Sequence, residues 1–460
     1  MGKFKNRVLN ILFWSVVSAA FIGPGTVTTA TKAGAEYQFD LLWSLVFATF
    51  ACLLLQEASA RITINSGMNL GQAIAKQFEG RPSKTLALIL VIGAIILGSA
   101  AYETGNILGS IAGLLLIFDI PKNYFVIGIG ALAILALSLK SIPLIARIMG
   151  GVVFFMGIAF FTTAIQLEPS LEAILKGAFT PTIPKADGSG LIILALIGTT
   201  VVPYDLFLGS GVLDKKQAIS EMRFGLSVAV ILGGIISMAI MAVGTVITAD
   251  FTYEALAQAL TYNIGPYAVY IFGFGMFAAG FSSAITAPLA SAITARSLFD
   301  KNSNERWKTN GRYFRMIYLG VLSFGLIFGI LNVNTIYVIT IAQALNGLIL
   351  PFISIFLIYV INDPCLMGEE NVNSWISNIL MAIVVWVTMI IGSINILKAI
   401  QNGLTKANLL SKEGFITDNL IITISILAFF LSIGILFLIK RFRNVRFRLL
   451  IKEDDLINSL

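Results

Sequence analysis

Long apolar runs constrain the fold of this chain more than any other sequence feature. A helix needs about 20 mostly apolar residues to cross a hydrocarbon layer of ~30 Å. Because lipid offers no hydrogen bonds to a polypeptide backbone, runs of this length must form helices. The sequence therefore predicts an all-α polytopic membrane protein with about 12 transmembrane helices. Their expected ranges are 9–33, 41–62, 86–117, 123–139, 143–166, 190–212, 224–248, 266–297, 314–331, 335–361, 376–397 and 419–440.

The composition excludes the main classes of soluble protein. The 460-residue chain is 57% apolar and 12% charged, whereas soluble proteins are about 25% charged. A soluble enzyme, a nucleic-acid-binding domain and a disordered chain are therefore excluded. The chain has no histidine, and its two cysteines, Cys52 and Cys365, are far apart, so no disulfide framework or metal-ligand cluster is expected. No nucleotide-binding loop, cofactor motif or H-E-x-x-H motif is present, so we expect no cofactor, no ATP-driven pump and no enzyme.

The distribution of positive residues predicts the orientation in the membrane. With the N-terminus inside, 24 of the 31 lysines and arginines fall in inside segments and 7 on the other side. This asymmetry predicts that both termini are cytoplasmic, in a plasma (inner) membrane. The net charge of +7 then reflects this orientation in the membrane. It also favours contact with membrane lipid, and we expect no binding of nucleic acid. The first run lacks an A-x-A-like cleavage site, so we interpret it as a retained first span rather than a signal peptide.

The linkers are too short to mark a second folded domain. We expect a single membrane transport domain, with a first repeat at about 9–166, a second at about 190–361 and extra helices at about 376–440. Two spans suggest this repeat, because Ala-x-Ile-Gly occurs at residues 20–23 and again at 195–198. In both copies a further glycine follows eleven residues after the first. Five spans separate the copies, so the second crosses the membrane in the opposite sense.

Both of these spans are interrupted by proline and glycine. Pro24 and Pro203 each remove a backbone donor and clash with the preceding turn, and Gly23 and Gly25 leave helical geometry at little cost. The backbone groups freed near the bilayer midplane must bond to water, an ion or a substrate. A single kink with its polar groups satisfied by neighbouring helices is common. Two interruptions at corresponding places in a repeat favour a secondary transporter that works by alternating access.

Several segments resemble the NRAMP family of divalent-metal transporters. Residues 23–35 are similar to the family's first-span pattern D-P-G-N…Q-A-G-A, and residues 196–206 to its sixth-span pattern I-G-A-T-V-M-P-H-N-L. Residues 282–286 fit the eighth span, and Gln343 with residues 350–352 fits the tenth. The resemblance covers roughly residues 10–400. It implies the LeuT-type fold, a 5+5 inverted repeat in which helices 1 and 6 are broken.

At the positions that the resemblance assigns to the metal and the proton, this chain has different residues. The first-span Asp and Asn, the sixth-span Met and two His, and the third-span Glu are here Gly23, Thr26, Val202, Tyr204, Gly209 and Asn106. A divalent ion at the bilayer centre needs charged or strongly dipolar oxygens, or soft sulfur, to replace its water. We therefore expect that proton-coupled import of Mn or Fe through the standard site is not this chain's activity.

The candidate residues form two sets. For the substrate we expect Gly23, Gly25, Thr26, Thr199, Val202, Tyr204, Asp205 and Gln343. For a coupling ion or proton pathway we expect Glu103, Asn106, Ser282, Ser283 and Lys32. Ionisable residues inside a membrane are functional candidates by default. Other interpretations stay open: Lys32 snorkels to the interface, Glu103 pairs with a buried partner, and the two serines only pack helices.

Two kinds of substrate fit these residues. A hard, partly hydrated cation such as Mg²⁺ would bind through water to Thr26, Asp205, Gln343 and freed carbonyls. A small organic solute such as an amino acid would place its carboxylate on the Gly23–Thr26 amides and its amine near Asp205. We favour the cation. An ion channel is the alternative of another class, but neither a repeated pore motif nor an acidic ring is visible.

Overall fold

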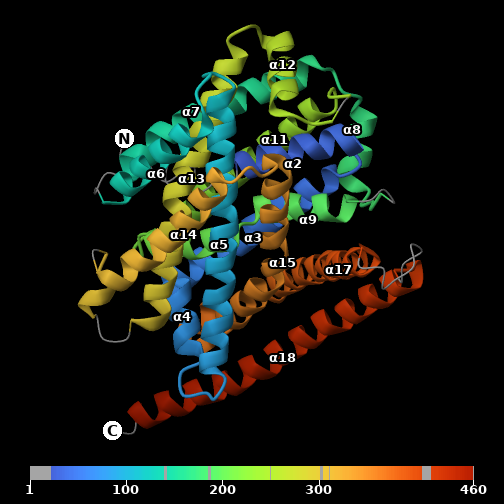
Figure 1. Ribbon diagram of the computed structural model, residues 1–460. Helices are drawn as coiled ribbons and strands as arrows, with labels where there is room; N and C mark the ends of the chain where they lie inside the picture. The colour runs from blue at the N-terminus through green and yellow to red at the C-terminus, as the bar shows by residue number, and fades with distance from the viewer. Residues whose placement is uncertain are drawn as a thin grey trace.

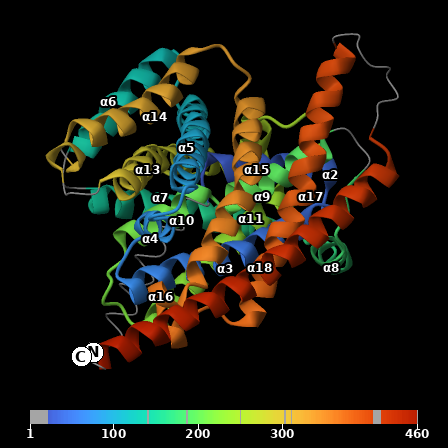
Figure 2. The same cartoon turned by 90° about the horizontal axis from the view of Figure 1, so that it is seen from below.

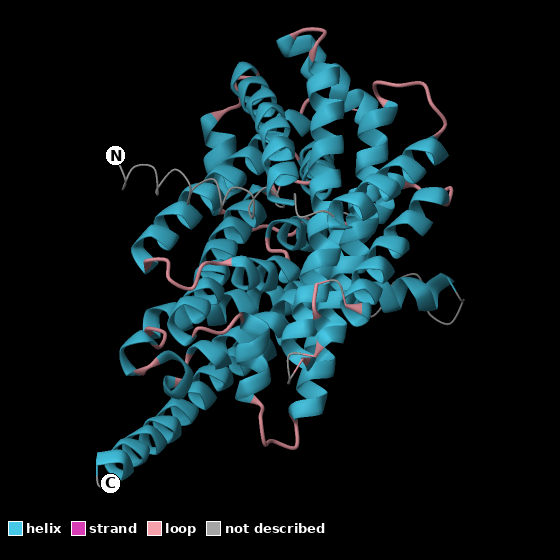
Figure 3. Ribbon diagram, turned by 90° about the vertical axis from the view of Figure 1, so that its left-hand side faces the viewer, coloured by secondary structure: helices cyan, strands magenta, loops and turns pink. Residues whose placement is uncertain are grey.

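The structure is a computed structural model. It describes residues 22–138, 142–184, 188–248, 250–300, 304–309, 311–406 and 416–458. Within these ranges every regular element is a helix, and no strand is found, as Figure 3 shows. This agrees with the all-α class predicted from the apolar runs.

Ten helices in the described part of the chain are long and apolar enough to cross a membrane, counting α9 with α10 as one. They are α3 (Leu42–Ser66), α5 (Lys84–Leu115), α7 (Ile142–Gln166), α9 (Ser189–Thr200) with α10 (Pro203–Val212), α11 (Ile219–Gly244), α13 (Ala268–Phe299), α14 (Arg312–Ile330), α15 (Thr335–Ile361), α17 (Trp375–Lys406) and α18 (Asp418–Asn458). An eleventh predicted span is the shorter helix α6 (Lys122–Ser138). Only the end of the first predicted span is described, as α2 (Pro24–Tyr37), and residues 9–21 lie outside the described ranges.

Short helices occur in the loops, where the sequence analysis expected none. They are α4 (Leu70–Gln77), α8 (Leu171–Phe179), α12 (Tyr253–Ile264), α16 (Pro364–Met367) and the 3₁₀ turns at Glu305–Trp307 and Glu369–Asn371. Side-chain caps explain why several of them begin where they do. Asn69 and Gln72 form a reciprocal capping box on α4, and Ser170 and Thr252 cap α8 and α12. Each cap satisfies an N–H group that the first turn of a helix leaves unpaired.

Two helices near the C-terminus are longer than predicted. We expected the eleventh span to end at residue 397, but α17 continues to Lys406. We expected the last span to end at residue 440, but α18 continues to Asn458. The length of an apolar run indicates only the part of a helix that lies in hydrocarbon. The charged continuation of α18 is rich in Arg, Leu and Lys, which are good helix formers, so the helix does not stop where the apolar run stops.

The helices differ sharply in how deeply they are buried. In the α9–α10 span, 94% of the residues in the apolar 18-residue stretch are buried, whereas only 11% of the residues in the apolar 18-residue stretch of α18 are buried. Figures 1 and 2 show this arrangement: α2 and α9 lie inside the bundle, and α18 runs along its outside. The two most Pro/Gly-disrupted spans of the sequence are therefore at the centre of the protein. This placement makes their interruptions the natural place to look for a site.

Candidate functional site

The sixth span is broken at the position that its proline and glycine content predicted. Helix α9 ends at Thr200 and α10 begins at Pro203; Val201 and Val202 between them are not helical, and Val202 is extended. Pro203 has no N–H group and occupies the first position of α10, where that group would be unpaired in any case. The last carbonyl groups of α9 therefore lack the amide partners that a continuous helix would supply. Val201 and Val202 are both buried.

The first span also has a helix start at its Pro/Gly motif. Gly23 is extended, with φ −87° and ψ 176°, and α2 begins at Pro24. The first helical hydrogen bond runs from the Val27 amide to the Gly23 carbonyl, at 3.1 Å. The N–H group of Gly25 thus lies outside the helical ladder, at the positive end of the helix dipole.

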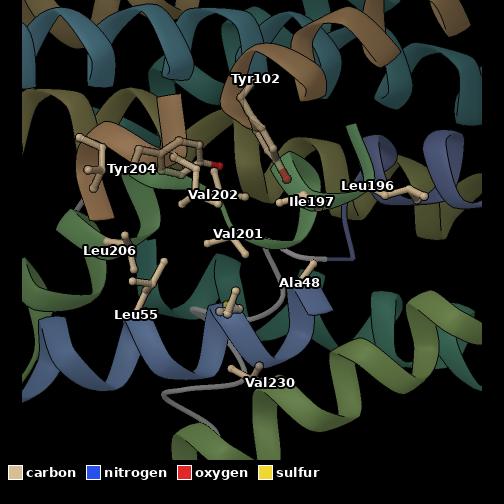
Figure 4. Close-up of a cluster of buried hydrophobic side chains, with 14 of the residues drawn as sticks. Ala48, Leu55, Tyr102, Leu196, Ile197, Val201, Val202, Tyr204, Leu206 and Val230 are labelled. Atoms are coloured by element: carbon tan, nitrogen blue, oxygen red, sulfur yellow. The ribbon is translucent and has the colours of Figure 1, made fainter. Parts of the chain in front are cut away.

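The two interruptions meet inside the protein. The hydroxyl oxygens of Thr26 in α2 and Thr199 in α9 are hydrogen-bonded at 2.9 Å, although 173 residues separate them in the sequence. Both side chains are buried. The sequence proposed both residues for the site, and the structure brings them together. Figure 4 shows the break itself, with Val201 and Val202 between the helix ends and Tyr204 and Tyr102 close by.

Gln343 of α15 forms a third side of the site. A Cβ atom placed on Gly25 would lie 2.3 Å from Nε2 of Gln343, so only glycine leaves room for this amide. A Cβ on Gly198 would lie 2.0 Å from the Gln343 carbonyl oxygen, which shows how closely α9 and α15 approach. Gln343 is 1% exposed, and neither amide atom has a hydrogen-bond partner in the described chain. Its amide is therefore available to a ligand.

Asp205 is a buried acidic residue next to the break. It lies in the first turn of α10, is 0% exposed, and both its carboxylate oxygens lack hydrogen-bond partners among the described residues. The neighbouring Tyr204 hydroxyl is also buried and without a partner there. The Tyr204 ring contacts the Tyr102 ring of α5 edge-on, with centroids 5.3 Å apart. This ring contact joins the break in the sixth span to α5.

Asn346 is a site residue that the sequence analysis missed. It follows Gln343 by one helical turn on α15, is 0% exposed, and its Oδ1 atom has no partner in the described part of the chain. Two α5 glycines make room for these amides. A Cβ on Gly105 would lie 3.3 Å from Gln343 Nε2, and one on Gly98 would lie 2.7 Å from Asn346 Oδ1. A polar residue three positions after Gln343 in an otherwise apolar run is the signal that could have identified it.

The residues expected for a coupling-ion or proton pathway come from three helices, α2, α5 and α13. Asn106 donates a hydrogen bond from Nδ2 to Oε2 of Glu103 at 3.3 Å, and both residues are buried. The Glu103 side chain faces α14, since a Cβ on Gly325 would lie 2.7 Å from its Cγ atom. Lys32 forms an ion pair with Glu36 at 3.2 Å and is partly exposed, two turns beyond Thr26 on α2. Its role in a pathway stays a prediction.

The two serines of α13 differ from one another. Ser283 is 2% exposed, whereas Ser282 is only half-buried. No group of three or more His, Cys, Asp or Glu side chains that could hold a metal ion occurs among the residues whose placement is described.

A broken sixth-span helix that meets the start of α2 beside unpaired polar groups, inside a bundle of membrane-length helices, is typical of a multi-pass membrane transporter. The chain belongs to the Nramp family: the family model described as natural resistance-associated macrophage protein-like matches residues 15–398. It is 25% identical over 395 residues to a divalent metal cation transporter, MntH, of Klebsiella pneumoniae, covering 82% of this chain and 91% of that protein. It is 27% identical over 293 residues to the MntH of Yersinia pestis, covering 60% and 70%.

Solved structures confirm the fold. A crystal structure of a manganese transporter from Eremococcus coleocola superposes with a TM-score of 0.70 at 19% identity, covering 96% of each chain. The inward-facing structure of Mhp1 has a TM-score of 0.53 at 15% identity, covering 94% of this chain and 91% of that one. At these identities the likeness shows the fold alone. The LeuT-type architecture expected from the sequence is therefore confirmed.

Proposed function

We propose that this chain is a secondary transporter that moves a cation by alternating access, with a hard divalent metal ion such as Mg²⁺ as the leading substrate. The relatives named as divalent metal cation transporters support the cation class, and one of them is matched over 91% of its length. The observation that carries the proposal is Asp205, a fully buried carboxylate at a helix break with no described hydrogen-bond partner.

An electrostatic comparison shows why this carboxylate favours a cation. The N-terminus of α10 stabilises a negative charge in its first turn by about 0.3–1 kcal/mol, and up to about 2 kcal/mol in buried geometry. Removing a carboxylate from water costs several kcal/mol. No described basic side chain forms an ion pair with Asp205 to make up the difference. A transported cation supplies the missing charge.

The atoms around the break favour a hard ion over a soft one. The oxygen donors are the Asp205 carboxylate, the Gln343 amide and the freed carbonyl groups at the end of α9. At the break itself Val202 offers no sulfur. With a single carboxylate, an ion keeps part of its water shell, as Mg²⁺ does in most proteins. An ion such as Fe²⁺ or Zn²⁺, which imidazole ligands suit, gains less from such a site.

One observation favours a second candidate substrate, a small amino acid. The first turn of α2 directs its free N–H groups toward the break, which suits a carboxylate, and Asp205 would receive the amine. The cation remains the main proposal because relatives named as divalent metal cation transporters support that class of substrate. We also propose that a coupling ion or proton passes along a set of five residues: Glu103, Asn106, Ser282, Ser283 and Lys32. We propose further that the chain forms a single transport domain and that both termini are cytoplasmic, in a plasma membrane.

Uptake into proteoliposomes tests the proposal. Mg²⁺, Mn²⁺ and a panel of amino acids are each presented to vesicles that contain the full chain. We expect saturable Mg²⁺ uptake that Asp205→Asn abolishes. Asp214→Asn is the matched control, because Asp214 is an exposed carboxylate just beyond the end of α10. Uptake of Mn²⁺ but not of Mg²⁺ would support a divalent cation as the substrate and would overturn the proposed preference for Mg²⁺. Metal-independent amino-acid flux would overturn the proposal.

A further inference from the structure

A groove outside the central site lies between α18 and the inner helices. It has a volume of about 540 Å³ and is almost entirely apolar. Its walls come from α15 and the last apolar turns of α18, and include Phe356, Ile435, Leu438, Ile439, Phe442 and Arg441. Leu438 is 67% exposed, so the groove opens toward the surroundings of the protein. Figures 1 and 2 show α18 crossing the outside of the bundle here, near α4.

The groove straddles the boundary between hydrocarbon and headgroups. Residues 420–439 of α18 are a run of 20 residues without a charge, and Lys440 and Arg441 follow directly. Twenty helical residues span about 30 Å, the thickness of the hydrocarbon layer. Arg441 therefore lies at headgroup depth, while Leu438 and Ile439 lie just inside the layer. An apolar groove at this depth that opens to lipid is filled by acyl chains.

Two cations at the same end of the groove are not neutralised by acids. Arg441 lines the groove, and no ion pair of Arg441 or Arg81 is found in the described part of the chain. Arg81, in the loop between α4 and α5, lies 5.7 Å from the Tyr359 ring centroid and 6.0 Å from that of Phe442, both of which line the groove. It also donates a hydrogen bond to the Tyr359 hydroxyl. Arg441, which is exposed, has no such contact.

We propose that this groove is a binding site for one anionic phospholipid. An acyl chain occupies the space beside Phe356 and Leu438, and the phosphate group lies at Arg441, with Arg81 adding positive potential behind the aromatic rings. Basic pockets between membrane helices at headgroup depth recognise anionic lipid headgroups in this way. A zwitterionic lipid would fill the apolar part equally well but would leave the charge of Arg441 unbalanced.

The bound lipid would reinforce the attachment of α18. Few residues of this helix are buried. Trp386 of α17 donates a hydrogen bond to its Ser425 carbonyl oxygen at 3.1 Å, and a second group of polar links lies near its C-terminal end. Arg446 forms a two-oxygen ion pair with Asp363, the closest contact being 2.7 Å, and Arg443 donates to the Asn373 carbonyl oxygen at 3.1 Å. Both links lie beyond Arg441 along the helix. A lipid between α18 and α15 extends the attachment toward the membrane interior.

Lipid retention by the full chain tests the site. The protein is placed in nanodiscs of phosphatidylcholine containing phosphatidylglycerol, and the lipid that it keeps after transfer to detergent is measured by native mass spectrometry. A cation near the surface contributes about 1 kcal/mol to binding an anionic lipid, so Arg441→Gln is expected to weaken phosphatidylglycerol retention about fivefold. Arg448→Gln is the matched control, an exposed arginine on the same helix that does not line the groove.

A second pair of variants tests the apolar part of the site. Leu438→Trp fills the groove and is expected to reduce the retention of bound lipid, while Leu427→Trp, equally exposed on α18 but outside the groove, leaves it unchanged. If Arg441→Gln and Arg448→Gln lose phosphatidylglycerol retention equally, the protein attracts anionic lipid in general, and the proposed site is refuted. Equal retention of phosphatidylcholine and phosphatidylglycerol, or two protein copies joined through α18 with no lipid retained, would also overturn it.

Discussion

Gly25→Ala is the substitution that most directly probes the contact between the first span and Gln343. The new methyl group would lie 2.3 Å from Gln343 Nε2, 2.6 Å from its Cδ atom and 3.0 Å from Thr199 Oγ1. An ordinary contact begins near 3.4 Å, so the amide must move by about 1 Å. The displaced atoms are the far end of a flexible side chain. The protein is therefore expected to fold, with the Gln343 amide held away from the break.

The functional cost follows from losing one polar contact to a charged ligand. A hydrogen bond that involves a charged group contributes about 1.5–3 kcal/mol. At 1.4 kcal/mol for each factor of ten, this predicts that the half-saturating cation concentration rises about ten- to hundredfold. Initial rates of Mg²⁺ uptake into proteoliposomes, measured over a range of concentrations, give this value. Maximal uptake per folded protein should change less, because the remaining ligands are intact.

Gly93→Ala is the control for this experiment. Gly93 is an exposed glycine on α5, and a Cβ atom there would meet nothing within 4 Å. Replacing a helical glycine by alanine at such a position stabilises the helix by up to about 1 kcal/mol and should leave uptake unchanged. If Gly25→Ala folds and retains the half-saturating concentration of the unmodified chain, Gln343 is not part of the substrate site.

Three further substitutions have expected outcomes that thermal unfolding in detergent can check. Thr199→Val removes the hydroxyl–hydroxyl bond to Thr26 and should lower stability by about 0.5–1.5 kcal/mol; an unchanged unfolding midpoint would show that this bond does not hold the two spans together. Gly198→Ala places a methyl group 2.0 Å from the backbone oxygen of Gln343, so the helices must separate at a cost of about 1–3 kcal/mol; a stabilised variant would contradict the close approach. Asp205→Asn removes an unbalanced buried charge and should unfold at the same or a higher temperature without substrate, whereas a large loss of stability would assign Asp205 a structural role.

The sequence predicts the fold well because its strongest signals are local. Lipid forces each long apolar run into a helix, so eleven of the twelve expected spans correspond to helices in the described chain. The break at Val201 and Val202 was also predictable, because Pro203 acts on its own turn. The charged half of α18 was not predicted, since hydropathy does not report where a helix ends outside the membrane.

The site itself was only partly predictable. Thr26, Thr199 and Gln343 could each be proposed from a motif, but their mutual contacts join segments more than 140 residues apart in the sequence. Glu103 illustrates the limit, because its position in the third span does not say which face of α5 it occupies. In the structure its Cγ atom packs against Gly325 of α14 and its carboxylate accepts a hydrogen bond from Asn106, contacts that the sequence pattern does not reveal. Side-chain direction depends on helix rotation, which apolar patterns determine poorly when a helix is apolar on every side.

Gln343 connects the chemistry of the site to the movement that transport requires. Its backbone oxygen faces Gly198 of α9, and its side chain reaches Gly25 of α2 and Gly105 of α5. Each contact is made through a glycine, so the helices approach one another closely at Gln343. A tilt of α2 or α9 relative to α15 must therefore displace the amide or break the contact. A ligand held by this amide would in turn favour one arrangement of the broken helices over another, which is the differential interaction that alternating access needs.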